Sequence, residues 1–155
     1  MSRSRQDAIR EFGTAIQRYQ RSVHDFDQAV AVSLELGSSD LRCLDALFDG
    51  PLPAGEIAQQ VGLKPAATTT LIDRLVARGF VRRIASETDR RKVVVEMTEQ
   101  ARELTWTSYG PLVSEGERIL ARLTGDQLLE FKKLIEAMTQ LTDKHRQRVS
   151  KDTEV

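Results

Sequence analysis

Residues 55–97, GEIAQQVGLKPAATTTLIDRLVARGFVRRIASETDRRKVVVEM, decide the fold of this 155-residue chain. The first part predicts a short helix that stops at Gly62, and a second helix that begins near Pro65 and ends at Gly79. After Gly79 the pattern becomes β-like, because FVRRI and KVVVEM flank the polar stretch SETDRR. Two short helices joined by a glycine-containing turn and followed by a hairpin indicate a winged helix-turn-helix.

Helices are also predicted on the N-terminal side of this region. Over 5–35 apolar residues recur every three or four positions, which is typical of an amphipathic helix, and Gly37 is its expected end. A further helix is expected to begin at one of the N-cap candidates in 38–40 and to end near Gly50.

On the C-terminal side, Thr98 is the expected N-cap of a long helix that runs through about Leu123. We expect Gly110-Pro111 to kink or interrupt that helix, because proline lacks a backbone donor and crowds the preceding turn. Thr124 is expected to cap a last helix, which carries an apolar stripe. The chain is therefore predicted to be mainly α with a small β-hairpin wing.

The predicted elements divide the chain into three structural regions. We expect 38–97 to form the winged helix-turn-helix, 5–36 and 98–148 to form a helical region, and 149–155 to form a flexible tail, all within one compact chain. The apolar stripes of the first and last helices are longer than a domain of this size is expected to bury alone. A second copy of the chain could cover them.

Charge is unevenly distributed in a chain whose formal net charge is zero. Residues 74–92 hold seven cations and two anions, whereas 93–130 hold three cations and seven anions. The neutral balance argues against a uniformly basic nucleic-acid coat, but the basic segment supplies a local patch.

Other features bound the class of protein. No apolar run approaches the length of about 20 residues that spans a membrane, and the basic N-terminus lacks the apolar stretch of a secretory signal. Cys43 is the only cysteine, so no intrachain disulfide exists and a reducing cytoplasm is the expected location.

The second helix of the motif suits DNA. Its leading surface, PAATTT, is slim enough to enter a major groove, where threonine hydroxyls and methyls can meet phosphates or base edges. Arg74 and Arg78 lie further along, where they could reach phosphates. The hairpin can carry Arg90 or Arg91 into the adjacent minor groove, and Asp89 is expected to pair with one of these arginines and orient it. The predicted DNA contacts are Pro65, Ala66, Thr68, Thr69, Thr70, Arg74, Arg90, Arg91 and Lys92.

These residues carry a resemblance to the MarR family of transcriptional regulators. The stretches EIAQQVGL, TTTLIDRL, RGFVRR and DRRKVVVEMT resemble the family's sequence elements and occur in the family's order within 55–103. The sequence departs from the family pattern at Ser86-Glu87-Thr88, where Asp-Pro is common, and at Glu99-Gln100-Ala101, where a glycine is often found.

The resemblance implies a homodimer whose N- and C-terminal helices intertwine and which binds double-stranded DNA at a pseudo-palindrome, as a repressor released by an effector. It also implies a small aromatic or anionic effector in a cleft, which Tyr19, His24, Trp106 and Tyr109 could line. The competing interpretation is that Trp106 belongs to the core and Tyr19 to an interface.

Several alternatives stay open at this point. A winged helix can serve protein contact without specific DNA binding, and Cys43 could make the regulator redox-responsive, although a lone cysteine is more often a small buried hydrophobe. With His24 and His145 as the only histidines, a metal site is not expected. No nucleophile spacing or phosphate-binding loop indicates an enzyme, and no cofactor is expected.

Overall fold

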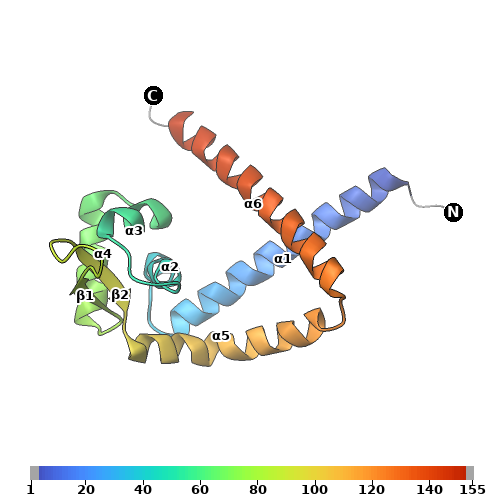
Figure 1. The fold of residues 1–155 in the computed structure, drawn as a ribbon. Coiled ribbons are helices and arrows are strands. Elements are labelled where there is room, and N and C mark those ends of the chain that lie inside the picture. The colour runs from blue at the N-terminus through green and yellow to red at the C-terminus, as the bar shows by residue number, and fades with distance from the viewer. Residues whose placement is uncertain (1–3, 153–155) are drawn as a thin grey trace. The chain divides into compact units, whose positions relative to one another are not determined.

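The computed structural model describes residues 4–152 and is mainly helical, with one hairpin (Figure 1). The elements are α1 (Arg5–Ser33), α2 (Ser38–Ala46), α3 (Ala54–Val61), α4 (Pro65–Ala77), β1 (Val81–Ala85), β2 (Val93–Met97), α5 (Glu99–Leu120) and α6 (Gly125–Asp152). This arrangement confirms the predicted fold class. No helix in the described part of the chain is long and apolar enough to cross a membrane.

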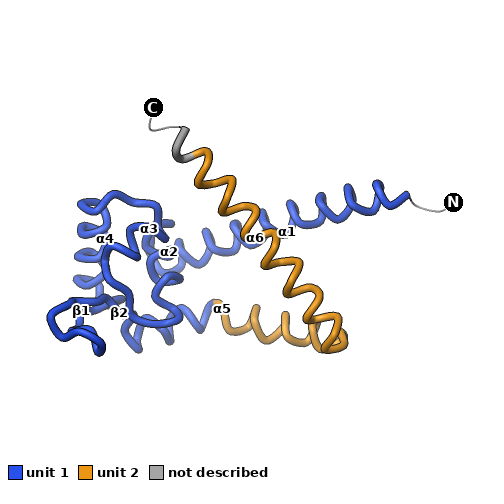
Figure 2. Tube along the Cα trace, turned by 45° about the horizontal axis from the view of Figure 1, so that its top comes forward, with its two compact units in different colours: residues 1–108 blue, residues 109–155 orange. Residues whose placement is uncertain are grey.

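The chain divides into two compact units, residues 1–108 and 109–155, with the division inside α5 (Figure 2). The first unit contains α1 to α4, the hairpin and the start of α5, and the second contains the rest of α5 and α6.

The core of the first unit is aliphatic and lies where α2, α3, α4 and β1 meet. Its fully buried side chains include Leu44, Leu47, Ile57, Ile72, Leu75 and Val81. Each helix contributes one apolar stripe, so burial of these stripes holds the three short helices together.

The hairpin is antiparallel and in simple register, from Val81 opposite Met97 to Ala85 opposite Val93. Leu52, in the segment between α2 and α3, adds one further bridge on the other edge of β2. The Leu52 amide donates to the Val95 carbonyl at 2.9 Å, and the Val95 amide donates to the Leu52 carbonyl at 2.8 Å. The start of the helix-turn-helix is thereby tied to the wing.

The corner between α1 and α2 differs from the prediction. The left-handed residue after α1 is Glu35, with φ of 53°, and Gly37 instead precedes α2 in an extended conformation. The Leu36 amide donates to the Ala31 carbonyl at 2.8 Å, which closes the helix end. Asp40 lies in the first turn of α2, where its carboxylate accepts from the Gly37 amide at 2.9 Å.

The caps of the last two helices confirm two predictions. The Ala101 amide donates to the Thr98 hydroxyl at 3.2 Å, and that hydroxyl donates to the Gly79 carbonyl at 2.7 Å. The Gln127 amide likewise donates to the Thr124 hydroxyl at 3.2 Å. Both threonines satisfy amides that a helix start leaves free.

The C-terminal helices differ from the prediction in their bounds. From the sequence, Gly110-Pro111 is expected to kink or interrupt the helix. Pro111 lies inside α5 and the helix continues through it, so the prediction of an interruption is wrong. The helix ends at Leu120 and not near Leu123, and α6 continues to Asp152. Residues 149–152 of the expected tail are therefore helical, and 153–155 lie outside the described residues.

The left-handed Glu35 generates a stability prediction. A side chain at positive φ costs about 1 kcal/mol, so Glu35→Gly should stabilise the fold by about that amount. Glu35→Ala is the matched control, because it removes the same side chain without relieving the backbone. Urea unfolding of the three proteins measures the difference, and a Gly variant no more stable than the Ala variant would contradict the argument.

Candidate nucleic-acid interface

The turn between α3 and α4 sets the direction in which α4 leaves the motif. Gly62 ends α3 with φ of 74°, a left-handed conformation that glycine adopts without a Cβ penalty. Lys64 is extended and Pro65 occupies the first turn of α4, where its missing N–H costs nothing.

The faces of α4 are sharply divided. Thr68, Leu71, Ile72 and Leu75 point inward and are buried. The side chains of Pro65, Ala66, Ala67, Thr69 and Thr70 are exposed. The outer surface of the first turns therefore carries only small side chains, as a groove-entering helix requires.

The three threonines do not have the same role. Each hydroxyl donates at 3.1 Å to the carbonyl four residues earlier, those of Lys64, Pro65 and Ala66. Thr68 is only 1% exposed, so the prediction that it contacts DNA is wrong: the helical phase that buries Leu71 and Ile72 turns it into the core. Thr69 and Thr70 keep an exposed methyl group and an oxygen able to accept a hydrogen bond.

Arg74 and Arg78 hold α4 against the rest of the unit. Arg74 Nη2 donates to Asp40 Oδ1 at 2.5 Å. Arg78 donates through Nη1 to the Glu35 carbonyl at 2.5 Å and through Nη2 to the Leu34 carbonyl at 3.0 Å. Both arginines thus have protein partners, and Arg74 stays a predicted DNA contact only through the donors that Asp40 leaves unused.

The two arginines of β1 are also paired. Arg82 Nε donates to Glu96 Oε1 at 2.5 Å across the hairpin, and Arg83 Nη2 donates to Asp73 Oδ1 of α4 at 2.6 Å. No spacing in the sequence indicates the Asp73–Arg83 pair, which joins the outer face of α4 to the wing. Sequence reasoning missed it, and likewise missed Asp40 as the partner of Arg74.

The wing tip leaves its cations available. Asp89 Oδ1 accepts from the Arg91 backbone amide at 3.1 Å, so the prediction that Asp89 pairs with an arginine side chain is wrong. The Lys92 amide donates to the Asp89 carbonyl at 2.8 Å, which closes the turn. The side chains of Arg90, Arg91 and Lys92 are exposed, and within residues 4–149 no acidic side chain pairs with them.

The basic segment therefore sorts into two sets. Its first four arginines are engaged by carboxylates or helix-end carbonyls, whereas the three cations of the tip pair with no acidic side chain of residues 4–149. Unpaired cations on an exposed turn suit a polyanion, because phosphate contacts release bound counterions.

The residues predicted to line an effector cleft are described within their own units. Tyr19 is 71% exposed and Trp106 is 52% exposed, so Trp106 does not belong to the core of this chain. His24 is exposed on α1, and Tyr109 belongs to the second unit. Their predicted role in ligand binding stays a prediction.

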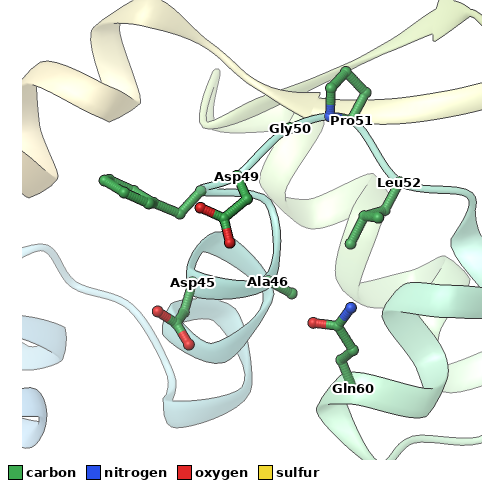
Figure 3. A pocket seen from close by; sticks show the side chains of 8 residues that line it. Asp45, Ala46, Asp49, Gly50, Pro51, Leu52 and Gln60 are labelled. Atoms are coloured by element: carbon green, nitrogen blue, oxygen red, sulfur yellow. The ribbon is translucent and has the colours of Figure 1, made fainter. Parts of the chain in front are cut away.

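A cavity of about 400 Å³ lies elsewhere in the first unit, beside the end of α2 and α3 (Figure 3). Its lining consists of Asp45, Ala46, Phe48, Asp49, Gly50, Pro51, Leu52 and Gln60. Burial, and then the charges of Asp27 and Asp49, raise the pKa of Asp45 above its ordinary value. Its two carboxylates repel an anion, so this cavity does not suit the anionic form of the predicted aromatic or anionic effector.

Cys43 lies in the core with 0% exposure. Burial, and secondarily the nearby charge of Asp40, raise the pKa of its thiol to about 12. The thiolate is the reactive form of cysteine, so burial and the raised pKa both disfavour reaction of this side chain in the folded chain. Among the described residues, no group of three or more histidine, cysteine or acidic side chains is placed to hold a metal ion.

A helix-turn-helix with a small outward face, followed by a hairpin with a basic tip, defines the winged-helix class of DNA-binding proteins. The family model for the MarR family matches residues 39–93. YcgE of Bacillus subtilis, an uncharacterized HTH-type transcriptional regulator, is 36% identical over 107 residues, covering 68% of this chain and 69% of YcgE. The HTH-type transcriptional repressor Mb2911 of Mycobacterium bovis is 32% identical over 106 residues, covering 68% of this chain and 76% of Mb2911.

Solved structures show the same fold. A MarR family protein from Bacillus stearothermophilus superposes with a TM-score of 0.65 at 15% identity, covering 91% of this chain and 99% of that protein. The chain belongs to the MarR family and is a DNA-binding transcriptional regulator.

The buried thiol generates a prediction about reactivity. At pH 8 the native chain should react with iodoacetamide at least about a hundredfold more slowly than the urea-unfolded chain, whose thiol has a pKa near 8.5. Because the folded pKa is raised, the native rate should stay low throughout pH 7–9. Fast native labelling at pH 8, measured by mass spectrometry, would restore Cys43 as a candidate redox sensor.

Proposed function

We propose that this regulator binds a pseudo-palindromic operator as a homodimer and represses transcription. The observation that carries the proposal is that one unit presents both a small exposed face on α4 and, at the wing tip, three cations that pair with no acid among residues 4–149. Pro65, Ala66, Thr69 and Thr70 would meet the major groove, while Arg90, Arg91 and Lys92 would meet the minor groove and phosphates. Repression is inferred from the similarity to Mb2911.

Exposed apolar faces support the homodimer. On α6 the exposed side chains recur every three or four residues: Leu128, Phe131, Leu134, Ile135, Met138 and Leu141. On α1 they include Ile9, Phe12, Tyr19 and Val23. Patches of this kind mark interaction sites, and a closed two-fold dimer would bury the same face from both copies.

The regional division follows from this proposal. Residues 38–97 would bind DNA, and 5–36 with 98–148 would form the dimer. We further propose that a small effector regulates the dimer, with Tyr19, His24, Trp106 and Tyr109 as its candidate contacts. A DNA-binding regulator acts where the chromosome is, which supports a cytoplasmic location.

Selection from a random double-stranded DNA pool at two salt concentrations tests the proposed function. We expect enrichment of a pseudo-palindrome with half-sites about 10 bp apart. An unenriched pool, with binding that vanishes as salt rises, would favour a winged helix that contacts another protein.

The wing tip generates the first mutational prediction. Arg90→Ala and Arg91→Ala should each weaken binding on all sequences and reduce the salt slope by about 0.9 per lost contact, or about 1.8 for the two wings of a dimer. Arg10→Ala on α1 removes the same charge from outside the candidate interface and serves as the control. Fluorescence anisotropy across a salt series measures both quantities, and an unchanged slope in both wing variants would remove the wing from the interface.

The apolar face of α6 generates a second prediction. Ile135 is 57% exposed in the single chain, so Ile135→Asp should place a charge within the dimer interface and dissociate it. Gln140→Asp introduces the same charge at an exposed polar position of α6 and should leave the dimer intact. Sedimentation equilibrium should give twice 17.4 kDa for the wild type and the control, and 17.4 kDa for the Ile135 variant. A dimeric Ile135→Asp protein would place the interface elsewhere.

A further inference from the structure

We propose that Arg78 is a positioning residue, which clamps the end of the recognition helix α4 to the end of α1 and thereby sets the spacing of the two recognition helices in the dimer. This inference rests on the proposed function. It replaces the expectation that Arg78 reaches a phosphate, because its guanidinium is already occupied by protein.

The clamp has a specific geometry. The two terminal nitrogens of Arg78 bind two successive carbonyls, Glu35 at 2.5 Å and Leu34 at 3.0 Å, where the carbonyls at the end of α1 lack helical partners. A cation at this position also meets the negative end of the α1 dipole. The guanidinium carbon lies 5.1 Å from the ring centre of Phe80, which holds the side chain from the other side.

A second connection lies one helical turn earlier on α4. Arg74 binds the carboxylate of Asp40, which also accepts from the Gly37 amide. Asp40 is 3% exposed, so this carboxylate has a fixed position in the corner between α1 and α2. Arg74 and Arg78 therefore fasten one face of α4 to the same corner, residues 34–40.

The helix α1 links this corner to the proposed dimer interface. Val30 and Ala31 near its C-terminal end are buried in the first unit, whereas its earlier turns expose apolar side chains such as Ile9 and Phe12. A single helix of 29 residues thus carries the clamp at one end and interface residues along the remainder.

Because α1 is long, a small rotation at the clamped end produces a large displacement at its other end. A rotation of about 5° at one end of a helix about 43 Å long displaces the other end by roughly 4 Å. That displacement is close to the spacing of successive bases, about 3.4 Å. One base pair moves a half-site by this distance and also turns it about the DNA axis by about 35°. A recognition helix that is loosely held at the corner would therefore adapt to such a misplaced half-site better than a clamped one.

The experiment compares the selected operator with versions that have one base pair inserted or deleted between the half-sites. We expect the wild-type dimer to lose at least about tenfold in affinity on the altered operators, and Arg78→Ala to lose no more than about threefold, with an unchanged salt slope. Arg78→Lys keeps the charge but replaces the two separate nitrogens with one, so its spacing penalty should lie between those of the wild type and Arg78→Ala. Asp40→Asn weakens the connection between Arg74 and Asp40, so it should also reduce the loss of affinity on the altered operators.

The controls separate this proposal from a phosphate contact and from the proposed function. Arg91→Ala should lower the affinity and the salt slope while keeping the full spacing penalty. A reduced salt slope in Arg78→Ala, with wild-type behaviour of Arg78→Lys, would overturn the clamp in favour of a phosphate contact. A full spacing penalty in every corner variant would overturn it as well. A wild-type protein without any spacing preference would overturn the proposed dimeric function itself, and the clamp with it.

Discussion

The DNA-binding unit depends on one buried carboxylate. Asp40 has almost no contact with water, so its charge must be met by protein donors, and the Gly37 amide and the Arg74 guanidinium supply them. Removing a partner from a fully buried pair costs roughly 3–5 kcal/mol, and the cost here is lower because Arg74 is half exposed. Because the buried carboxylate needs these donors, the corner after α1, the first turn of α2 and the middle of α4 all meet around Asp40.

The same requirement explains how a chain of zero net charge presents a basic surface. Carboxylates of the folded unit pair with Arg74, Arg82 and Arg83, so these three residues add little net charge to the surface. Arg78 keeps its charge, but two of its donors are directed at backbone carbonyls. The tip of the wing has no such partners within the described residues: Asp89 accepts from the backbone of the turn, and no ion pair joins Glu87 to the three cations. Charge segregation in the sequence marks the correct region, and the fold concentrates the available charge at three residues.

Much of the architecture could be predicted from the sequence, since periodicity, glycine and proline positions, and threonine caps are local signals. The hairpin and the caps at Thr98 and Thr124 follow from such signals. Thr68 could not be separated from Thr69 and Thr70 in this way, because its burial depends on which face of α4 meets the core. Local sequence patterns also could not predict the partners of Arg74, Arg78 and Arg83, because these partners lie 34, 43 and 10 residues away along the chain.

The bridge between Leu52 and Val95 has a consequence for association. An exposed strand edge invites another strand to pair with it, and in a hairpin each strand has one such edge. Leu52 covers part of the free edge of β2, and prolines on either side of it, at positions 51 and 53, have no amide with which to lengthen the pairing. The outer edge of β2 is therefore a poor template for growth of a sheet between molecules, which leaves β1 as the strand of the wing that another chain could pair with.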